Sequence, residues 1–265
     1  GHNDFTFSFH PGVFTPERNT REHAENAEAF RALFDENYEL AAALLEPLAK
    51  NGNATAACDL ALIYLRGHLP TSDFSHAASR LLFAAEEGSE LAIFELGCLV
   101  GQGRFGEPSP ELAFQFFVLA AERGWREAQF QGGFTLLRGY GIDKDREQAL
   151  TWLRIAAEND HALANYDLDT TLLEQHPPDY AGAMEHYLKS AELGHAYGYN
   201  KAGQLYQHGL GVAQSFHEAA RLYELSAEQK NEWGCFLLGM LHQAGRGVDQ
   251  NDKRAFELFE EAANQ

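Results

Sequence analysis

The feature that most constrains this chain is a motif that returns after 36 residues. Residues 208–215 read HGLGVAQS and residues 244–251 read AGRGVDQN, so that Gly209, Gly211 and Val212 recur 36 positions later. Division at this period gives six units: 53–88, 89–124, 125–160, 161–194, 195–230 and 231–265, of which 161–194 is two residues shorter. Repeats of this length predict a solenoid in which neighbouring units share a continuous core.

Each unit begins with the pattern of a helix. Its fourth residue is Ala or Gly and its eighth is usually apolar, and these two positions lie on one helix face. The ninth residue is Gly97, Gly133, Gly203 or Gly239 in four units. Glycine inside a helix costs about 1 kcal/mol relative to alanine. We therefore expect a neighbouring helix to approach closely at this position.

A second helix follows in each unit after a loop. It carries Ala four residues before Phe, Tyr or Leu, and its start should have a side chain that caps the free N–H groups. The expected caps are Asp73, Ser109, Asp145, Asp179, Ser215 and Asn251. The same register gives Asn37, so an incomplete unit, 17–52, precedes the six. Most units end in glycine, the usual left-handed terminator, with Asp160 and Lys230 as exceptions.

Residues 1–16 belong to no unit. Phe5, Phe7 and Phe9 alternate with polar residues there, which predicts an extended strip over the first helix pair. The domain prediction is thus a non-repeat extension, 1–16, and a single solenoid, 17–265. The chain starts with Gly1 rather than Met, as after trimming, so both a periplasmic location after loss of a signal peptide and a cytoplasmic one remain open.

The composition excludes several kinds of partner. The formal net charge of −19 repels nucleic acid and anionic lipid surfaces. No apolar run approaches the roughly 20 residues of a membrane span. Cys58, Cys98 and Cys235 are too scattered for a disulfide framework, and we expect buried thiols. We predict no nucleic-acid partner and no membrane span.

The repeats resemble a known family. The segments AGQLYQHGLGVAQSFHEAARLYELSA and LGMLHQAGRGVDQNDKRAFELFEEAA look like Sel1-like repeats, relatives of the tetratricopeptide repeat, and the resemblance covers residues 37–265. It departs at Asp169, which replaces the helix glycine, and in three loops that lack the second glycine. The resemblance implies an all-α, right-handed superhelical solenoid of antiparallel helix pairs that serves in protein–protein contacts. Many relatives are bacterial envelope or secreted proteins, and some are immunity proteins.

By analogy with related repeats, the first helices should line a concave face. The sixth position of the units holds Cys58, Phe94, Phe130, Tyr166, Asn200 and Phe236, and the tenth adds Phe134 and Met240. The seventh position adds Asp59, Glu95 and Asp167. We predict a partner-binding surface of Phe94, Phe130, Phe134, Tyr166, Phe236, Asp59, Glu95 and Asp167. Such a surface suits a basic segment, although Arg66 and Arg138 at the fourteenth position oppose the simplest version; alternatively, the aromatic residues are ordinary core.

The sequence offers little for catalysis or cofactors. The twelve histidines include no H-E-x-x-H pair, and His161 and His195 stand where helices begin. Asp143 and Asp145 lack the spacing of a calcium loop. No serine stands in G-x-S-x-G, and no cysteine has a nucleophile signature. We predict no cofactor, no metal and no enzyme.

The leading hypothesis is a non-catalytic protein that binds one protein partner in its groove, such as a secreted toxin or effector, as an immunity or regulatory inhibitor. An envelope scaffold or adaptor is the alternative. A cell-wall or amide hydrolase that uses acidic pairs such as Asp59 and Glu95 is a further one.

Overall fold

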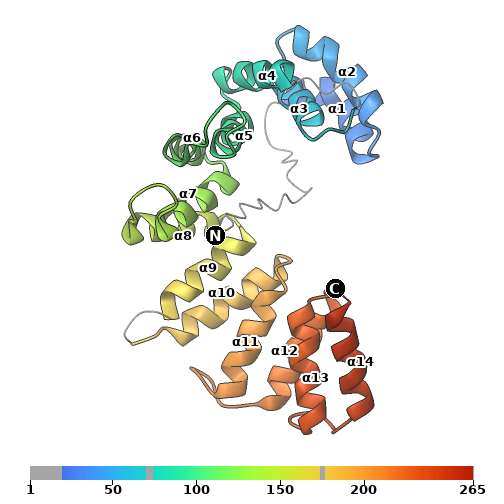
Figure 1. The fold of residues 1–265 in the computed structure, drawn as a ribbon, viewed down its shortest axis with the longest axis vertical. Helices are drawn as coiled ribbons and strands as arrows, with labels where there is room; N and C mark the ends of the chain where they lie inside the picture. The colour runs from blue at the N-terminus through green and yellow to red at the C-terminus, as the bar shows by residue number, and fades with distance from the viewer. Residues whose placement is uncertain (1–19, 70–73, 174–176, 265) are drawn as a thin grey trace. The chain divides into compact units, whose positions relative to one another are not determined.

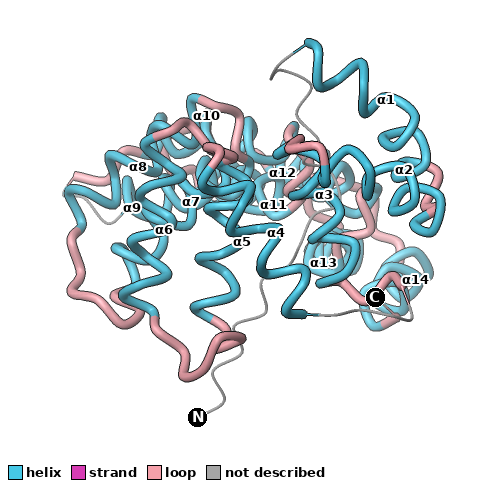
Figure 2. Tube along the Cα trace, turned by 90° about the horizontal axis from the view of Figure 1, so that it is seen from above, coloured by secondary structure: helices cyan, strands magenta, loops and turns pink. Residues whose placement is uncertain are grey.

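The computed structural model describes residues 20–69, 74–173 and 177–264, and in these ranges every regular element is an α-helix (Figure 2). The helices are α1 (Thr20–Phe34), α2 (Tyr38–Lys50), α3 (Ala54–Leu65), α4 (Phe74–Glu86), α5 (Glu90–Gly101), α6 (Pro110–Glu122), α7 (Arg126–Arg138), α8 (Arg146–Glu158), α9 (Ala162–Leu173), α10 (Tyr180–Glu192), α11 (Tyr197–His208), α12 (Phe216–Glu228), α13 (Glu232–Ala244) and α14 (Asp252–Ala263). The predicted all-α repeat fold is confirmed. The predicted strip at residues 1–16 lies outside the described residues.

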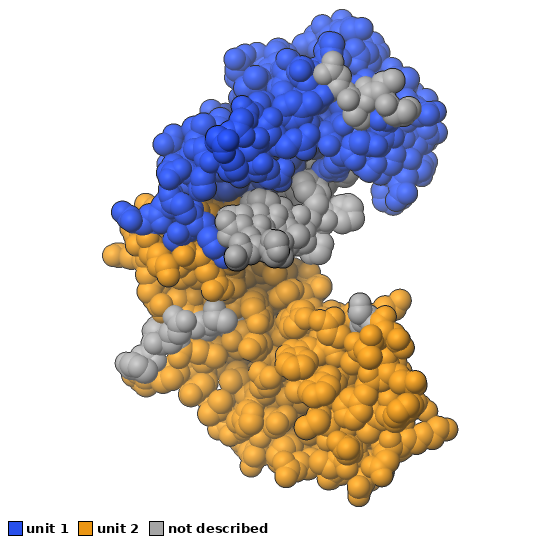
Figure 3. All heavy atoms as spheres, in the orientation of Figure 1, with its two compact units in different colours: residues 1–128, 139–143 blue, residues 129–138, 144–265 orange. Residues whose placement is uncertain are grey.

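The helices fall into two compact units, coloured separately in Figure 3. Unit 1 comprises residues 1–128 and 139–143, and unit 2 comprises residues 129–138 and 144–265, so the division falls within α7. Within each unit the helices that pack most closely are consecutive pairs, such as α3 with α4 and α13 with α14 (Figure 1). Each unit is therefore a stack of helix pairs.

The predicted second-helix caps begin their helices as expected. In each described case the side chain accepts a hydrogen bond from the backbone N–H three residues on; the Asp145 carboxylate, for example, lies 2.9 Å from the Gln148 nitrogen. The others are Asn37, Ser109, Asp179, Ser215 and Asn251. Asp73 lies outside the described residues.

The loop glycines that opened the sequence analysis are turn residues. Gly209 ends α11 with φ 69°, Gly211 follows with φ 70°, and the Ser215 N–H donates to the Tyr206 carbonyl at 2.9 Å. Gly245 and Gly247 repeat this conformation after α13. The G-x-G sequence therefore reverses the chain between two helices of one repeat.

The ninth-position glycines lie where second helices cross. A Cβ added at Gly97 would meet the Phe117 ring at 2.9 Å, and one at Gly239 would meet the Phe259 ring at 2.7 Å. The repeated Ala of the second helix and the large residue four positions on are buried in the same region, as Ala183 and Tyr187 show. The prediction of a close helix approach is confirmed.

The left-handed terminator is kept even where glycine is missing. Gly52, Gly88, Gly124 and Gly194 have φ between 89° and 96°. Lys230, which ends the equivalent turn of another repeat, has φ 57°. A side chain with a Cβ is strained in this region by roughly 1 kcal/mol.

We expect Lys230→Gly to raise the free energy of unfolding by about 1 kcal/mol, because it removes this strain. Lys230→Ala is the matched control, since it removes the charge and keeps the Cβ. Urea denaturation of both variants measures the difference. Equal stability of the glycine and alanine variants would show that the turn stores no strain.

Candidate functional site

The predicted surface residues divide between the two units. Asp59, Phe94 and Glu95 lie in unit 1, and Phe130, Phe134, Tyr166, Asp167 and Phe236 lie in unit 2. Phe94 and Phe130 are buried, Phe134 and Tyr166 are half-buried, and Phe236 is exposed. The structure brings Phe130 and Phe134 together, with ring centroids 5.7 Å apart.

Four sixth-position side chains contact the next repeat. Each of the four contacts the residue in the first position of the following unit. The pairs are Cys58 with Ser89 through a hydrogen bond, Phe130 stacked on His161 at 4.4 Å, Tyr166 edge-on to His195 at 5.0 Å, and Asn200 hydrogen-bonded to Asn231 at 2.8 Å. The sixth position is therefore a junction position in these four repeats, and Phe130 contributes to the packing between repeats, whereas Phe94 packs on Phe117 of its own repeat.

His161 joins two repeats in a second way. Its Nδ1 accepts a hydrogen bond from the Ala164 N–H at 3.1 Å, so it caps α9 while its ring stacks on Phe130. This arrangement requires an unprotonated Nδ1. The expected helix-start role of His161 is confirmed, and the ring is occupied by structural contacts.

The two acidic residues predicted for the surface of unit 1, Asp59 and Glu95, are buried. Burial raises the pKa of the Asp59 carboxyl to about 7, against a lowering by the Arg66 guanidinium. Burial also raises the pKa of the Glu95 carboxyl to about 7; Arg66 lowers it and Glu127 raises it further. Asp59 Oδ2 and Glu95 Oε1 have no hydrogen-bond partner. Arg66 thus lowers the pKa of two buried carboxyl groups.

The same pairing returns in unit 2. Desolvation raises the pKa of the Asp167 carboxyl to about 6, and the positive charge of Arg138 lowers it. Arg66 and Arg138 both occupy the fourteenth position, and each acts on the seventh-position carboxyl of the next repeat, Glu95 or Asp167. Arg66 and Arg138 therefore favour the ionised form of these carboxyl groups. Asp167 is half-buried.

One exposed residue of this surface, Trp233, is not among those that the repeat pattern predicts. Trp233 is 46% exposed and stacks on Phe236, with ring centroids 5.2 Å apart; Met240 follows and is 47% exposed. Trp233, Phe236 and Met240 are spaced by three and four residues, so they form one stripe of α13. Trp233 occupies the third position of its unit, on the same first helix as the predicted sixth and tenth positions. We call these three residues the α13 stripe.

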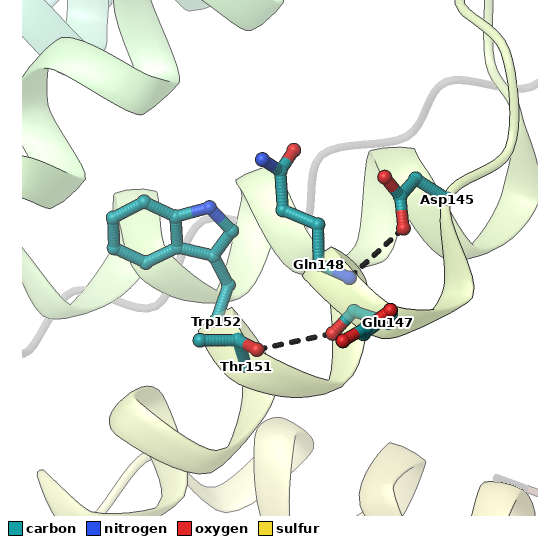
Figure 4. A pocket seen from close by; sticks show the side chains of 5 residues that line it. All are labelled: Asp145, Glu147, Gln148, Thr151 and Trp152. Carbon is teal, nitrogen blue, oxygen red and sulfur yellow. Dashed lines mark hydrogen bonds between the residues drawn. The ribbon is translucent and has the colours of Figure 1, made fainter.

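Two surface cavities are lined by described residues. One, of about 380 Å³, lies along the start of α8 against Asp145, Gln148 and Trp152 (Figure 4). The Asp145 carboxylate there is already bonded to the Gln148 nitrogen. The other, of about 670 Å³, lies between α8, α9 and α10 over Asn165 and Leu168. The Asn165 side chain at its floor is bonded to His186 and to the His161 carbonyl.

The three cysteines are free and buried, as expected, and burial raises the pKa of each thiol. No group of three or more His, Cys, Asp or Glu side chains in the described ranges is placed to hold a metal ion. No described helix is long and apolar enough to cross a membrane.

Comparison with solved structures identifies relatives of this fold. The crystal structure of c5321, a protective antigen present in uropathogenic Escherichia coli strains, is 29% identical over 84% of this chain and 48% of that chain, with a TM-score of 0.78. This chain thus spans about half the length of that antigen. A Sel1 repeat protein from Oxalobacter formigenes is 27% identical over 77% and 82% of the two chains, with a TM-score of 0.68.

A more distant likeness is to the immunity protein PA5088 from Pseudomonas aeruginosa, which is 17% identical over 80% and 82% of the two chains, with a TM-score of 0.49. No curated protein sequence matches the chain. The sequence profile of the Sel1 repeat matches residues 54–89, 91–125, 126–161, 173–195, 196–231 and 234–265. These segments make up most of the chain, and the protein therefore belongs to the Sel1 repeat family.

Proposed function

We propose that this chain is a non-catalytic protein that binds a partner protein through the accessible first-helix side chains of unit 2, and that binding inhibits the partner, as an immunity or regulatory factor does. Sel1 repeats mediate protein–protein interactions. The observation that carries the proposal is the α13 stripe, because three large apolar side chains are exposed on one helix face. Half-buried Phe134 and Tyr166 offer further aromatic contacts on α7 and α9.

The charge of the chain indicates the chemistry of the partner. The net charge of −19 attracts a basic surface and accelerates its association at low salt. Asp167, beside Tyr166 in the sequence, is the one acidic residue of the predicted surface that is half-buried rather than buried. Asp59 and Glu95 are buried, so they do not take part in this proposal. The partner we propose is a secreted toxin or effector that carries a basic segment with apolar anchors.

The hydrolase alternative requires a carboxyl pair that a substrate can reach. Asp59 and Glu95 are buried, and neither of the two cavities described above includes them. The scaffold alternative keeps the same binding surface and differs in the size of the assembly. Size-exclusion chromatography of the complex separates the two, since an inhibitor gives a complex of defined small size and an adaptor a larger assembly.

Replacing Trp233 and Met240 with alanine together is expected to weaken partner capture at least tenfold, because aromatic anchors carry most of the binding free energy. The full chain is immobilised, and the captured protein is identified and then titrated by surface plasmon resonance. Leu119→Ala is the control, since Leu119 is an exposed leucine on α6 in unit 1.

The inhibitory part of the proposal needs its own measurement. The activity of the captured protein should fall on addition of the chain and recover with the Trp233 and Met240 double variant. Capture without any loss of activity would leave the adaptor as the better description. Capture that the double variant and Leu119→Ala affect equally would remove the α13 stripe from the binding surface.

A further inference from the structure

The cavity between α8, α9 and α10 in unit 2 contains a polar pair that the repeat fold does not require. His186 of α10 places its Nδ1 atom 3.2 Å from Asn165 Oδ1 of α9. Asn165 is the fifth residue of its unit, and His186 is the seventh residue after the cap of its second helix. In the unit 231–265 these two positions hold Cys235 and Leu258, which are both fully buried. The same place in the repeat therefore accepts an apolar pair.

The hydrogen bonds of the polar pair determine which nitrogen of the imidazole ring carries the proton. Asn165 Nδ2 donates to the His161 carbonyl at 3.0 Å, so Asn165 Oδ1 is turned toward His186. This oxygen can only accept, and Nδ1 of His186 must therefore be the protonated nitrogen. In the neutral ring Nε2 then has a free lone pair, and it makes no hydrogen bond within the described ranges. Burial lowers the pKa of His186, which favours the neutral ring.

The charges around the cavity favour a cation over an anion. Three carboxylates line it, those of Glu158, Glu185 and Glu192. Of the two cationic residues, Lys189 is bonded to Asp160 at 2.8 Å, and Arg154 is exposed at the edge. The rest of the lining includes three apolar residues, Ala157, Leu168 and Leu188. A ligand that fits this lining carries a positive charge, donates hydrogen bonds and covers apolar surface.

We propose that the cavity between α8, α9 and α10 binds an arginine side chain in a segment of a partner protein, with the guanidinium donating to His186 Nε2 and to the surrounding carboxylates. A guanidinium has five N–H donors in one plane, so a single side chain can serve the imidazole and a carboxylate together. Its methylene groups suit the apolar part of the lining. The volume of about 670 Å³ also leaves room for flanking residues of the segment.

This site goes beyond the proposed function. It shares no residue with the α13 stripe, and it includes neither Phe134 nor Tyr166. The site is tested with a peptide and not with a captured protein. Its failure therefore leaves the proposed function in place, and loss of the α13 stripe from the binding surface leaves this site in place.

The probe is a fluorescently labelled, acetylated and amidated pentapeptide with one central arginine between two leucines. Fluorescence anisotropy at pH 8 measures its Kd for the full chain. His186→Leu should raise the Kd about tenfold, because it removes the acceptor of a charged hydrogen bond. This variant should fold, since Leu222 and Leu258 hold the same position in other units. Glu185→Gln should raise the Kd about threefold.

Glu228→Gln is the matched control and should leave the Kd unchanged. Glu228 occupies on α12 the position that Glu192 occupies on α10, and it does not line the cavity. A second peptide with citrulline in place of arginine keeps the shape of the side chain and removes its charge. Its Kd should be about tenfold higher. Nitrogen-15 spectra of the imidazole of His186 should show a protonated Nδ1 and a peptide-dependent shift of Nε2.

Absence of saturable binding overturns the inference, as does a Kd that His186→Leu and Glu228→Gln change equally. Equal binding of the arginine and citrulline peptides would contradict the recognition of a charge. A proton on Nε2 of His186 in the free chain would contradict the proposed acceptor. Displacement of the peptide by inorganic phosphate would make the cavity an anion site. Binding of N-acetylarginine amide as tight as that of the peptide would replace the protein segment by a small guanidinium compound.

Discussion

Gly203→Ala is expected to destabilise unit 2 by about 2 kcal/mol, although alanine is the better helix former. A Cβ at Gly203 would lie 2.5 Å from the Tyr223 ring, well inside contact distance. Tyr223 has no exposed surface, and its hydroxyl donates to Gln207 Oε1 at 2.9 Å, so the ring cannot turn aside without losing this bond. Overpacking of a tight core costs about 1–3 kcal/mol or more, which exceeds the gain of about 1 kcal/mol in helix propensity.

Gly132→Ala is the matched control, and it should change the free energy of unfolding in the opposite direction. Gly132 lies within α7, and a Cβ there would meet no atom within 4 Å. The substitution should therefore raise the free energy of unfolding by about 0.5–1 kcal/mol through helix propensity alone. Urea denaturation of the full chain, followed by circular dichroism, measures both variants. If both substitutions changed the free energy of unfolding in the same direction, helix propensity, and not the contact with Tyr223, would decide the effect of glycine at these positions.

The contrast between these two glycines shows what the sequence could establish. The ninth-position glycine recurs with the repeat, and this regularity was enough to predict a helix crossing. The caps, such as Asp145 and Asn251, were predictable for the same reason, because a cap depends on residues within one turn. Local rules that recur at a fixed spacing reinforce one another, so the fold could be derived without a structure.

The exposure of the sixth-position residues could not be derived in this way. Phe130 and Phe236 occupy equivalent positions, yet one is buried under His161 and the other is exposed. The difference depends on whether another repeat covers the residue, which the helix pattern itself does not contain. The pairing of the fourteenth-position arginines with carboxyl groups of the next repeat was missed similarly, because it joins side chains separated by 29 residues in the sequence, as in Arg66 and Glu95.

Unit 1 is expected to lose stability as the pH rises from about 4 to about 7. Burial raises the pKa values of the Asp59 and Glu95 carboxyls to about 7, from ordinary values of 3.8 and 4.5. Between the unfolded and folded values the native state binds more protons than the unfolded chain, so the free energy of unfolding falls with rising pH. Above the folded pKa both carboxyls are ionised in both states, and the loss is complete. One pKa unit corresponds to about 1.4 kcal/mol, so the loss should amount to a few kcal/mol.

Asp59→Asn and Glu95→Gln should each remove part of this dependence. At pH 8 either variant should be more stable than the parent by about 2 kcal/mol, and at pH 4 the difference should be small, because the amide resembles the protonated carboxyl. Arg66→Met should have the opposite effect at pH 8, since Arg66 is the group that lowers both pKa values. Glu122→Gln on the exposed side of α6 is the control.

The fluorescence of Trp125 can report the unfolding of unit 1 separately from that of unit 2. With Trp152→Phe and Trp233→Phe, it is the one tryptophan left in the chain, and it lies in unit 1. Urea denaturation followed by its fluorescence at pH 4, 6 and 8 then reports on the unit that holds Asp59 and Glu95. A stability of unit 1 that is flat or rises between pH 4 and 8 would mean that the two carboxyls are solvated or fully paired with Arg66. If the free energy of unfolding of unit 1 falls between pH 4 and 8, and Asp59→Asn and Glu95→Gln together abolish this fall, the two buried carboxyl groups cause it.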